Sequence, residues 1–344
     1  MNRGTWSNRI RIGMAAALVV IGASGIALAQ AQALRGKVAV DGSSTVYPVT
    51  EAAAAAFRKD FPNVNVTVAI SGTGGGFKRF VTGETDISDA SRPITPKEFS
   101  LAKENGIRFI EIPVALDGLT IVLNPQNDWV ENLTVEQLYA IYAEDGKARK
   151  WSDLNPAWPN QPIKVYSPGS DSGTFDYFRE VVIPKGKSFR SDMSTSEDDN
   201  VLVTGVTGDK YSIGYFGASY YFENKSKLKA APIVNPKDGK AYLPNPEDVV
   251  NGNYAPFSRP LFIYVNLKSL QRPEVRKFVE FYSENAAQFA QQVKYDPVPA
   301  SVAAIAKDFL KGRRTGSTYV TKEGEKRDGG LPAVYKAENL HDTQ

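Results

Sequence analysis

Short apolar stretches alternate with helix-like segments along most of the chain, and this alternation predicts an α/β fold. Val64–Ile70 shows the strand pattern clearly, because apolar and polar residues alternate along it. Lys37–Val40 and Ile163–Tyr166 are shorter predicted strands. Thr50–Asp60, which is rich in alanine, and Pro273–Gln291 have helical patterns.

The same pattern predicts more than one domain. Ile107–Val114 and Leu119–Asn124 are predicted strands separated by Leu116-Asp117-Gly118, where we expect the chain to cross between two lobes. The length of 344 residues is enough for two domains of ordinary size. From Gly312 onward the chain is polar, charged and rich in glycine, so we predict a mobile tail at residues 313–344.

The first 29 residues have the pattern of a secretory signal peptide. Three arginines precede an apolar run from Met14 to Ala29, and Ala27-Leu28-Ala29 and Ala31-Gln32-Ala33 both fit an A-x-A cleavage site. The run is about 16 residues long, whereas a membrane-spanning helix needs roughly 20. No cysteine is present to carry a lipid anchor, so we expect a periplasmic protein that is free of the membrane.

Charge argues against nucleic acid as a partner. Removal of residues 1–29 takes three arginines from the 41 basic side chains, which leaves 38 against 38 acidic ones. Such a balanced chain has no overall positive field to attract nucleic acid. The fold must depend on ordinary hydrophobic cores, which an apolar content of 42% permits.

A single histidine argues against several kinds of chemistry. It is His341, the fourth residue from the C-terminus. Zinc sites built from histidine or cysteine are therefore not expected, and a Ser-His-Asp triad would need the tail to supply its base. We predict no metal and no cofactor.

Three loops rich in serine, threonine and glycine each follow a predicted strand and precede a predicted helix. They are Gly42–Thr45, Ser71–Gly76 and Ser170–Thr174. Such a junction directs unpaired backbone N–H groups and the positive end of the helix dipole outward. Glycine lets the backbone approach an anion closely, and hydroxyl groups add donors without charge. Three such loops together favour an anion-binding site.

Known nucleotide and hydrolase loops fit these segments less well. A Walker A loop ends in Gly-Lys-Ser/Thr, but Gly76 is followed by Phe77-Lys78-Arg79. A dinucleotide-binding loop needs a third glycine where Phe77 stands, and the hydrolase motif G-x-S-x-G would have Asp171 as its nucleophile. These differences favour recognition of an anion over catalysis on it.

Arg92 is the candidate cation for such a site. It comes directly after the predicted strand that ends at Ala90. Its guanidinium can hold a tetrahedral oxyanion through two parallel hydrogen bonds. The competing interpretation is a surface arginine paired with Asp89.

Four segments together resemble the motifs of periplasmic phosphate-binding proteins of phosphate ABC transporters. They are Asp41–Pro48, Ser71–Lys78, Asp86–Ile94 and Gly169–Phe175. Their order and spacing agree with the family, and the similarity covers roughly Lys37 to Leu310. Four motifs in register are far more specific than any one of them.

The resemblance implies a type II periplasmic-binding-protein fold, in which the ligand is enclosed between two α/β lobes. Lobe 1 is then expected to be discontinuous, with residues 36–117 and 257–312, and lobe 2 to span residues 118–256. By motif position, the resemblance implies a set of phosphate-binding residues drawn from all four motifs: Ser44, Thr45, Thr73, Gly74, Ser91, Arg92, Ser172, Gly173 and Thr174.

The chain departs from some family members in two motifs. They carry an arginine just before the fourth motif and an aspartate in the third, whereas this chain has Pro168 and Ser91-Arg92 there. We infer that Arg92 takes the cationic role. A buried carboxylate that accepts the proton of hydrogen phosphate would discriminate against sulfate, which carries no proton near neutral pH. Asp89 and Asp171 are both candidates for this carboxylate, and the sequence does not choose between them.

The resemblance implies high-affinity binding of inorganic phosphate and delivery to a membrane ABC permease, without enzymatic activity. We expect a monomer. One alternative is a binding protein for another tetrahedral oxyanion, such as sulfate or molybdate. A second is a phosphatase with Ser44 or Ser172 as nucleophile, although a histidine base is lacking. A third is a phosphate sensor or surface protein that serves no transporter.

Overall fold

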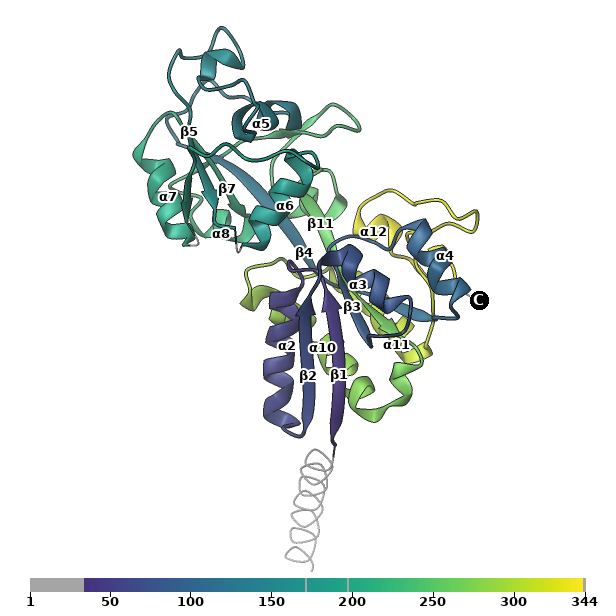
Figure 1. The fold of residues 1–344 in the computed structure, drawn as a ribbon. Helices are drawn as coiled ribbons and strands as arrows, with labels where there is room; N and C mark the ends of the chain where they lie inside the picture. The colour runs from purple at the N-terminus through teal and green to yellow at the C-terminus, as the bar shows by residue number, and fades with distance from the viewer. Residues whose placement is uncertain (1–33, 171, 197, 343–344) are drawn as a thin grey trace, which may run out of the picture.

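The chain folds into two α/β lobes joined by two long strands (Figure 1). The computed structural model describes residues 34–170, 172–196 and 198–342. The predicted signal peptide and the candidate Asp171 lie outside these residues. Each lobe has a sheet covered by helices, so the predicted two-lobed α/β fold is confirmed. Within the described ranges, no helix is both long and apolar enough to cross a bilayer.

Lobe 1 is built on parallel strands in the order β2 (Val64–Ile70), β1 (Gly36–Gly42) and β3 (Ile87–Ala90). β11 (Ser258–Asn266) lies antiparallel to β3 and continues the sheet. The helices of this lobe are α2 (Tyr47–Asp60), α3 (Gly72–Phe80), α4 (Pro96–Glu104), α10 (Pro273–Gln292) and α11 (Ala300–Gly312), and a short 3-10 turn, η2 (Ser269–Gln271), precedes α10.

β4 (Phe109–Leu123) runs without a break from lobe 1 into lobe 2 (Figure 1). Its first part pairs with β11, and its last part pairs with β7 (Ser212–Gly217). We expected two strands with a crossing at Leu116-Asp117-Gly118, but the structure has one strand. The ladder continues because Asp117 lies opposite Arg259 of β11, which provides a partner for its carboxylate.

Lobe 2 continues the sheet from β7 through β5 (Lys164–Pro168) to β6 (Ser194–Ser196), and β8 (Lys229–Ala230) pairs with β4. Thr134 and Gln137 form the capping box that their spacing predicts, with the Gln137 amide donating to the Thr134 hydroxyl at 3.2 Å. The remaining elements of this lobe are α5 (Val135–Tyr142), η1 (Trp151–Asp153), α6 (Gly173–Val182), α7 (Asp199–Gly208), α8 (Ala218–Glu223), β9 (Ile233–Val234), β10 (Ala241–Tyr242) and α9 (Pro246–Asn251).

The lobes have separate hydrophobic cores. The core of lobe 1 takes buried residues from Val38 to Leu116 and again from Leu261 to Tyr335. Two further clusters in lobe 2 take residues from Leu119 to Phe257. The lobe boundaries given above from the sequence remain a prediction, and this separation of the cores supports them.

The segment after Gly312 packs on lobe 1, which differs from the mobile tail that we expected. Tyr319, Val320 and the short helix α12 (Leu331–Val334) belong to the core of this lobe, and the chain continues through η3 (Ala337–Asn339). The buried carboxylate of Glu111 accepts hydrogen bonds from Ser317 and Thr318 of this segment. A largely polar sequence is held in place here by a few buried aromatic residues and by one buried acceptor.

Candidate functional site

Backbone contacts fix the first three motifs at one edge of the lobe 1 sheet. Gly42 lies so close to β3 that a methyl group on its α-carbon would be 2.1 Å from the carbonyl oxygen of Asp89, and its φ of +147° also favours glycine. The amide of Ser43 donates to that same carbonyl at 3.0 Å. Ser71 of the second motif donates its amide to the carbonyl of Gly42 at 3.1 Å. The loops that follow β1, β2 and β3 are therefore held together.

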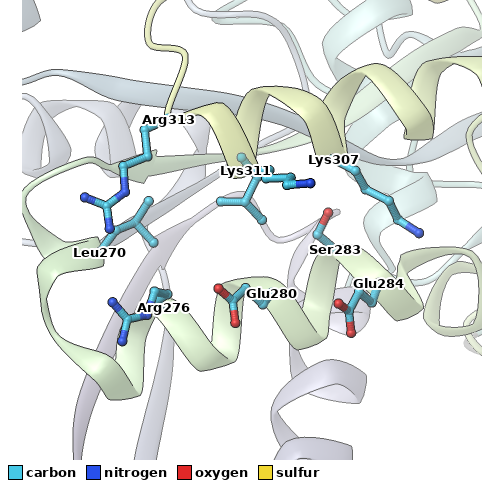
Figure 2. Close-up of a pocket in the computed structure, with 9 residues that line it drawn as sticks. Leu270, Arg276, Glu280, Ser283, Glu284, Lys307, Lys311 and Arg313 are labelled. Carbon is cyan, nitrogen blue, oxygen red and sulfur yellow. The ribbon is translucent and has the colours of Figure 1, made fainter.

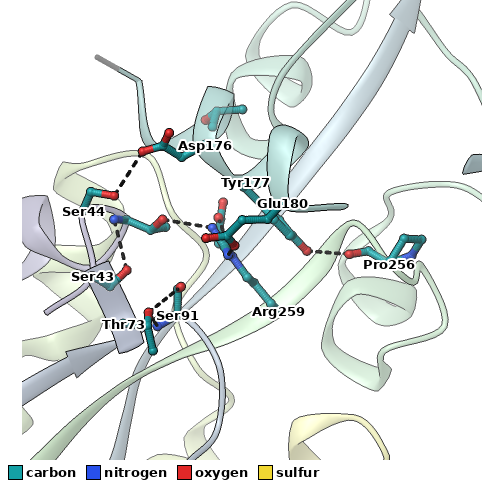
Figure 3. A network of polar contacts seen from close by, with 12 residues as sticks. Ser43, Ser44, Thr73, Ser91, Asp176, Tyr177, Glu180, Pro256 and Arg259 are labelled. Carbon is teal, nitrogen blue, oxygen red and sulfur yellow. Dashed lines mark hydrogen bonds and ion pairs between the residues drawn. The ribbon is translucent and has the colours of Figure 1, made fainter. Parts of the chain in front are cut away.

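Two predicted binding residues of lobe 1 contact each other. The hydroxyl oxygens of Thr73 and Ser91 are 3.0 Å apart, and the amide of Ser91 donates to the Thr73 hydroxyl at 3.1 Å. Figure 3 shows this pair beside the first loop. Hydroxyl groups rotate freely, so both can turn toward an anion.

The first motif also reaches lobe 2. The hydroxyl of Ser44 donates to the carboxylate of Asp176, in the first turn of α6, at 3.3 Å (Figure 3). The fourth motif forms the start of the same helix, where Ser172 is the N-cap and accepts a hydrogen bond from the amide of Thr174 at 3.2 Å. The first and fourth motifs therefore face each other across the two lobes.

A cleft of about 500 Å³ lies at this meeting point of the lobes. Its lining includes Ser44 and Gly72 of lobe 1 and Asp176, Arg179 and Glu180 of α6. The loop after α6 adds Lys185 and Lys187, so the hydroxyl of Ser44, two carboxylates and three cations border the same space. Such a lining suits a small polar ligand better than an apolar one.

An arginine from the interlobe strand β11 lies beside the first motif. Arg259 donates from Nη2 to the hydroxyl of Thr45 at 2.9 Å, and it forms ion pairs with Asp117 of β4 and Glu180 of α6. Its guanidinium carbon lies over the ring of Tyr177, 3.5 Å from the ring centroid. Burial disfavours the charged form, but the nearby carboxylates outweigh it, so the pKa of Arg259 is raised above its ordinary value.

A family model described as a PBP superfamily domain matches residues 27–285. The chain belongs to the PBP superfamily. This match covers more than half of the chain, including all four motifs and the interlobe strands.

Comparison with individual proteins narrows the position of the chain within the PBP superfamily. Protein SphX of Synechococcus elongatus is 44% identical over 94% of this chain and 95% of its own length. The phosphate-binding protein PstS of Staphylococcus saprophyticus is 40% identical over 85% of this chain and 88% of its own. A crystal structure of a possible phosphate-binding protein from Planctomyces limnophilus has 47% identity and a TM-score of 0.79, and covers 82% of this chain and 99% of its own. The resemblance to substrate-binding proteins of phosphate ABC transporters is confirmed.

Some residues predicted for the binding site in this PBP superfamily member have other partners. Arg92 donates from both terminal nitrogens to the carboxylate of Glu98, at 2.8 and 2.9 Å, and the hydrogen bond to Glu98 raises its pKa. Glu98 also closes the capping box of α4. The competing interpretation placed Arg92 against Asp89, but the partner is Glu98. The role of Arg92 in binding stays a prediction.

Asp89 lies on β3, and its side chain is buried in lobe 1. Its carboxylate is buried, neither oxygen has a hydrogen-bond partner among the described residues, and Thr50 and Asp41 are close enough to influence its titration. Burial, with a smaller contribution from the charge of Asp41, raises the pKa of Asp89 to about 8. At neutral pH this group is therefore mostly protonated.

The sequence did not identify Arg259, Tyr177 and Glu180 as neighbours of the site. Arg259 stands in Ser258-Arg259-Pro260, just before the apolar stretch Leu261–Val265, and Asp117 stands at the predicted crossing. Two opposite charges at the predicted lobe boundary were the available signal. Their pairing joins positions 142 residues apart, which spacing within one segment cannot reveal.

A second concave region lies apart from the four motifs. It is a groove of about 410 Å³ between α10 and α11 in lobe 1 (Figure 2). Four basic side chains and two carboxylates are among the residues that line it. The full lining is Leu270, Arg276, Glu280, Ser283, Glu284, Lys307, Leu310, Lys311 and Arg313. Its lining comes from one lobe only, so closure of the lobes would not enclose a ligand there.

Proposed function

We propose that this chain binds inorganic phosphate outside the cytoplasm and delivers it to an ABC-type phosphate permease. The PstS relative and the similar solved structure support phosphate as the ligand. The observation that carries the proposal is the hydrogen bond between Ser44 of lobe 1 and Asp176 of lobe 2, because it brings the first motif against the helix that begins in the fourth. An anion in the adjacent cleft would meet hydroxyl donors from both lobes.

The proposed ligand contacts are mainly uncharged. Thr45, Thr73 and Ser91 would donate hydroxyl hydrogen bonds from lobe 1, and the Gly74 amide would add a backbone donor. Ser172, Gly173 and Thr174 would contribute the N-terminal end of α6, where helix N–H groups favour negative charge. Hydrogen bonds to a charged group contribute roughly 1.5–3 kcal/mol each. Four or five of them, less the ordering cost, would reach the about −8 kcal/mol of a micromolar site.

Closure over the ligand follows from this distribution of donors. Because the donors come from both lobes, phosphate would contact more of them in the closed arrangement than in an open one. A ligand with that preference shifts the population toward the closed arrangement. The closed form would then be the one presented to the permease.

We also propose a periplasmic monomer, secreted through the predicted signal peptide, with no cofactor, no nucleic-acid partner and no catalytic activity. The balance of basic and acidic side chains supports the absence of a nucleic-acid partner. Among the described residues, no group of three or more histidine, cysteine, aspartate or glutamate side chains could hold a metal ion.

Discrimination against sulfate is proposed to depend on a carboxylate near the anion. Asp171 of the fourth motif is the favoured candidate. Asp89 is disfavoured because its pKa of about 8 keeps it mostly protonated at neutral pH, and a protonated acid does not repel sulfate by charge. An Asp171→Asn variant should then lose affinity for phosphate and gain affinity for sulfate.

Calorimetric titration of the purified protein tests the proposed function. Phosphate and arsenate should each produce saturable heat, and sulfate and molybdate should produce none. Saturable binding of sulfate in preference to phosphate would overturn the choice of ligand. Turnover of p-nitrophenyl phosphate that Ser44→Ala or Ser172→Ala abolishes would instead support the phosphatase alternative.

A further inference from the structure

Arg259 is a buried cation beside the first motif, and it belongs to none of the four motifs. Only 11% of its side chain is exposed. The ring of Tyr177 lies against one face of the guanidinium, with 3.5 Å between the guanidinium carbon and the ring centroid. Stacking of this kind fixes the plane of a guanidinium and therefore the directions of its N–H groups.

The partners of the three guanidinium nitrogens differ in exposure, and Figure 3 shows Glu180 beside Arg259. Nε faces the carboxylate of Asp117 at 3.3 Å, and Asp117 is only 2% exposed. Nη2 donates to the hydroxyl of Thr45 at 2.9 Å, in the first motif. Nη1 donates to Glu180 at 2.9 Å, and the side chain of Glu180 is 64% exposed. Two of the partners are therefore buried, and the third is a solvent-accessible carboxylate that lines the cleft.

We propose that Arg259 is the cationic ligand of phosphate and that Glu180 occupies its Nη1 until phosphate displaces it. This inference rests on the proposed function. The Glu180 carboxylate resembles the incoming anion, because it accepts a hydrogen bond from Nη1 and lines the cleft that the anion would enter. An exposed ion pair contributes little to stability, so its loss costs little when a dianion takes its place. Asp117 stays paired throughout, so the buried guanidinium is never left without a counter-ion.

Arg92 fits this role less well. Both of its terminal nitrogens are bound to Glu98, and that carboxylate also accepts hydrogen bonds from the amide and hydroxyl of Thr95. Release of Arg92 would therefore disturb the capping box of α4. Release of Nη1 of Arg259 needs only a rotation of one exposed side chain.

The sequence is consistent with a cation supplied from outside the motifs. Pro168 stands near the position where some family members have an arginine, just before the fourth motif. A guanidinium that reaches the first motif from β11 would replace the missing charge. Arg259 belongs to β11, which joins the lobes, so phosphate bound to Arg259 would contact the connection between the lobes directly.

The test is a calorimetric titration with inorganic phosphate of the purified wild-type protein and five variants. Glu180→Gln removes the competing charge and keeps the shape of the side chain. Arg259→Lys keeps the positive charge and removes the planar fork, and the double variant combines these two changes. Arg92→Ala tests the competing cation. Lys311→Gln is the matched control, because it changes one exposed charge in the groove between α10 and α11.

We expect Glu180→Gln to tighten phosphate binding about two- to fivefold, which is the range of an exposed ion pair. Arg259→Lys should weaken it by at least about tenfold. In the double variant, the gain from Glu180→Gln should disappear, since it acts only through the Arg259 guanidinium. Arg92→Ala should have a smaller effect than Arg259→Lys, and Lys311→Gln should have none.

The outcomes separate the two proposals. Absence of phosphate binding by the wild-type protein would refute the proposed function. Normal binding by the wild-type protein, with unchanged or weaker binding by Glu180→Gln, would overturn the role of Glu180. Arg92→Ala more damaging than Arg259→Lys would return the cationic role to Arg92. The Glu180→Gln result does not depend on the folding of any Arg259 variant, because Glu180 is an exposed residue on α6.

Discussion

Gly330, in the segment after α11, lies directly against Asn251 at the end of α9 in lobe 2. A methyl group on the α-carbon of Gly330 would be 2.1 Å from the carbonyl oxygen of Asn251. The φ of Gly330 is −67°, which any residue can adopt, so space and not backbone conformation requires glycine here. The C-terminal segment therefore packs on lobe 1 through Tyr335 and contacts lobe 2 through Gly330.

Gly330→Ala should lower the free energy of unfolding by about 1–3 kcal/mol, because two backbone segments must move apart to admit the methyl group. Urea denaturation followed by circular dichroism measures the change. Gly208→Ala is the matched control, since a methyl group at Gly208 would meet no atom within 4 Å. Equal stability of Gly330→Ala and the wild-type protein would show that this contact is not maintained in solution.

Glu111→Ala should release the C-terminal segment from lobe 1. The variant removes a buried acceptor and leaves the hydroxyls of Ser317 and Tyr264 and the amide of Thr318 without it. We expect a loss of about 3 kcal/mol in stability. Trypsin should also cleave faster after Lys322 and Arg327, whereas Glu131→Ala, at an exposed position, should leave cleavage unchanged. Unchanged cleavage in Glu111→Ala would mean that other contacts are sufficient to hold the segment.

Asp89 predicts a pH dependence of stability. Its pKa is raised from 3.8 to about 8 in the folded chain, so the folded state binds the proton more tightly than the unfolded state. This contribution is complete below about pH 4 and is lost as the pH rises to about 8. Asp89→Asn should remove it, and the gain in unfolding free energy over the wild-type protein should be at least about 1 kcal/mol larger at pH 8 than at pH 5. A gain that is equal at both pH values would contradict the raised pKa.

Thr73→Val should weaken phosphate binding by at least about tenfold, because it removes a hydroxyl donor and leaves the amide of Ser91 without its acceptor. The side chain keeps nearly the same volume, so the fold should persist with a modestly lower melting temperature, and the main loss should appear in the calorimetric dissociation constant. Thr67→Val, on the exposed face of β2, is the matched control. Wild-type affinity in Thr73→Val would exclude Thr73 from the phosphate contacts.

The sequence predicted those features that depend on local pattern. The α/β class, the capping box of Thr134 and Gln137, and the loops at the strand–helix junctions all depend on residues a few positions apart. The family followed from the four motifs, because each motif is a short run of residues and their order can be read directly from the sequence. Thr73 and Ser91 could be placed in one site for the same reason.

The sequence did not predict features that depend on pairing between distant segments. The partner of Asp117 comes from a strand 142 residues later, and β4 continues through this pairing where we expected a break between two strands. The ordered C-terminal segment could not be predicted for the same reason, because Glu111 accepts a hydrogen bond from Thr318, which is 207 residues away. Arg92 was assigned by its place in a motif, whereas the capping box of α4 supplied a carboxylate that the motif does not include.

The pairing of β4 with β11 has a mechanical consequence for ligand exchange. The two chain connections between the lobes form one hydrogen-bonded ribbon that reaches from Asn266↔Phe109 to Ser258↔Gly118. A ribbon of this kind bends and twists gradually over several residues, whereas a single flexible loop would let the lobes swing freely. Entry and release of a ligand would therefore strain this ribbon elastically, and the strain would return the lobes to their resting angle once the ligand has left.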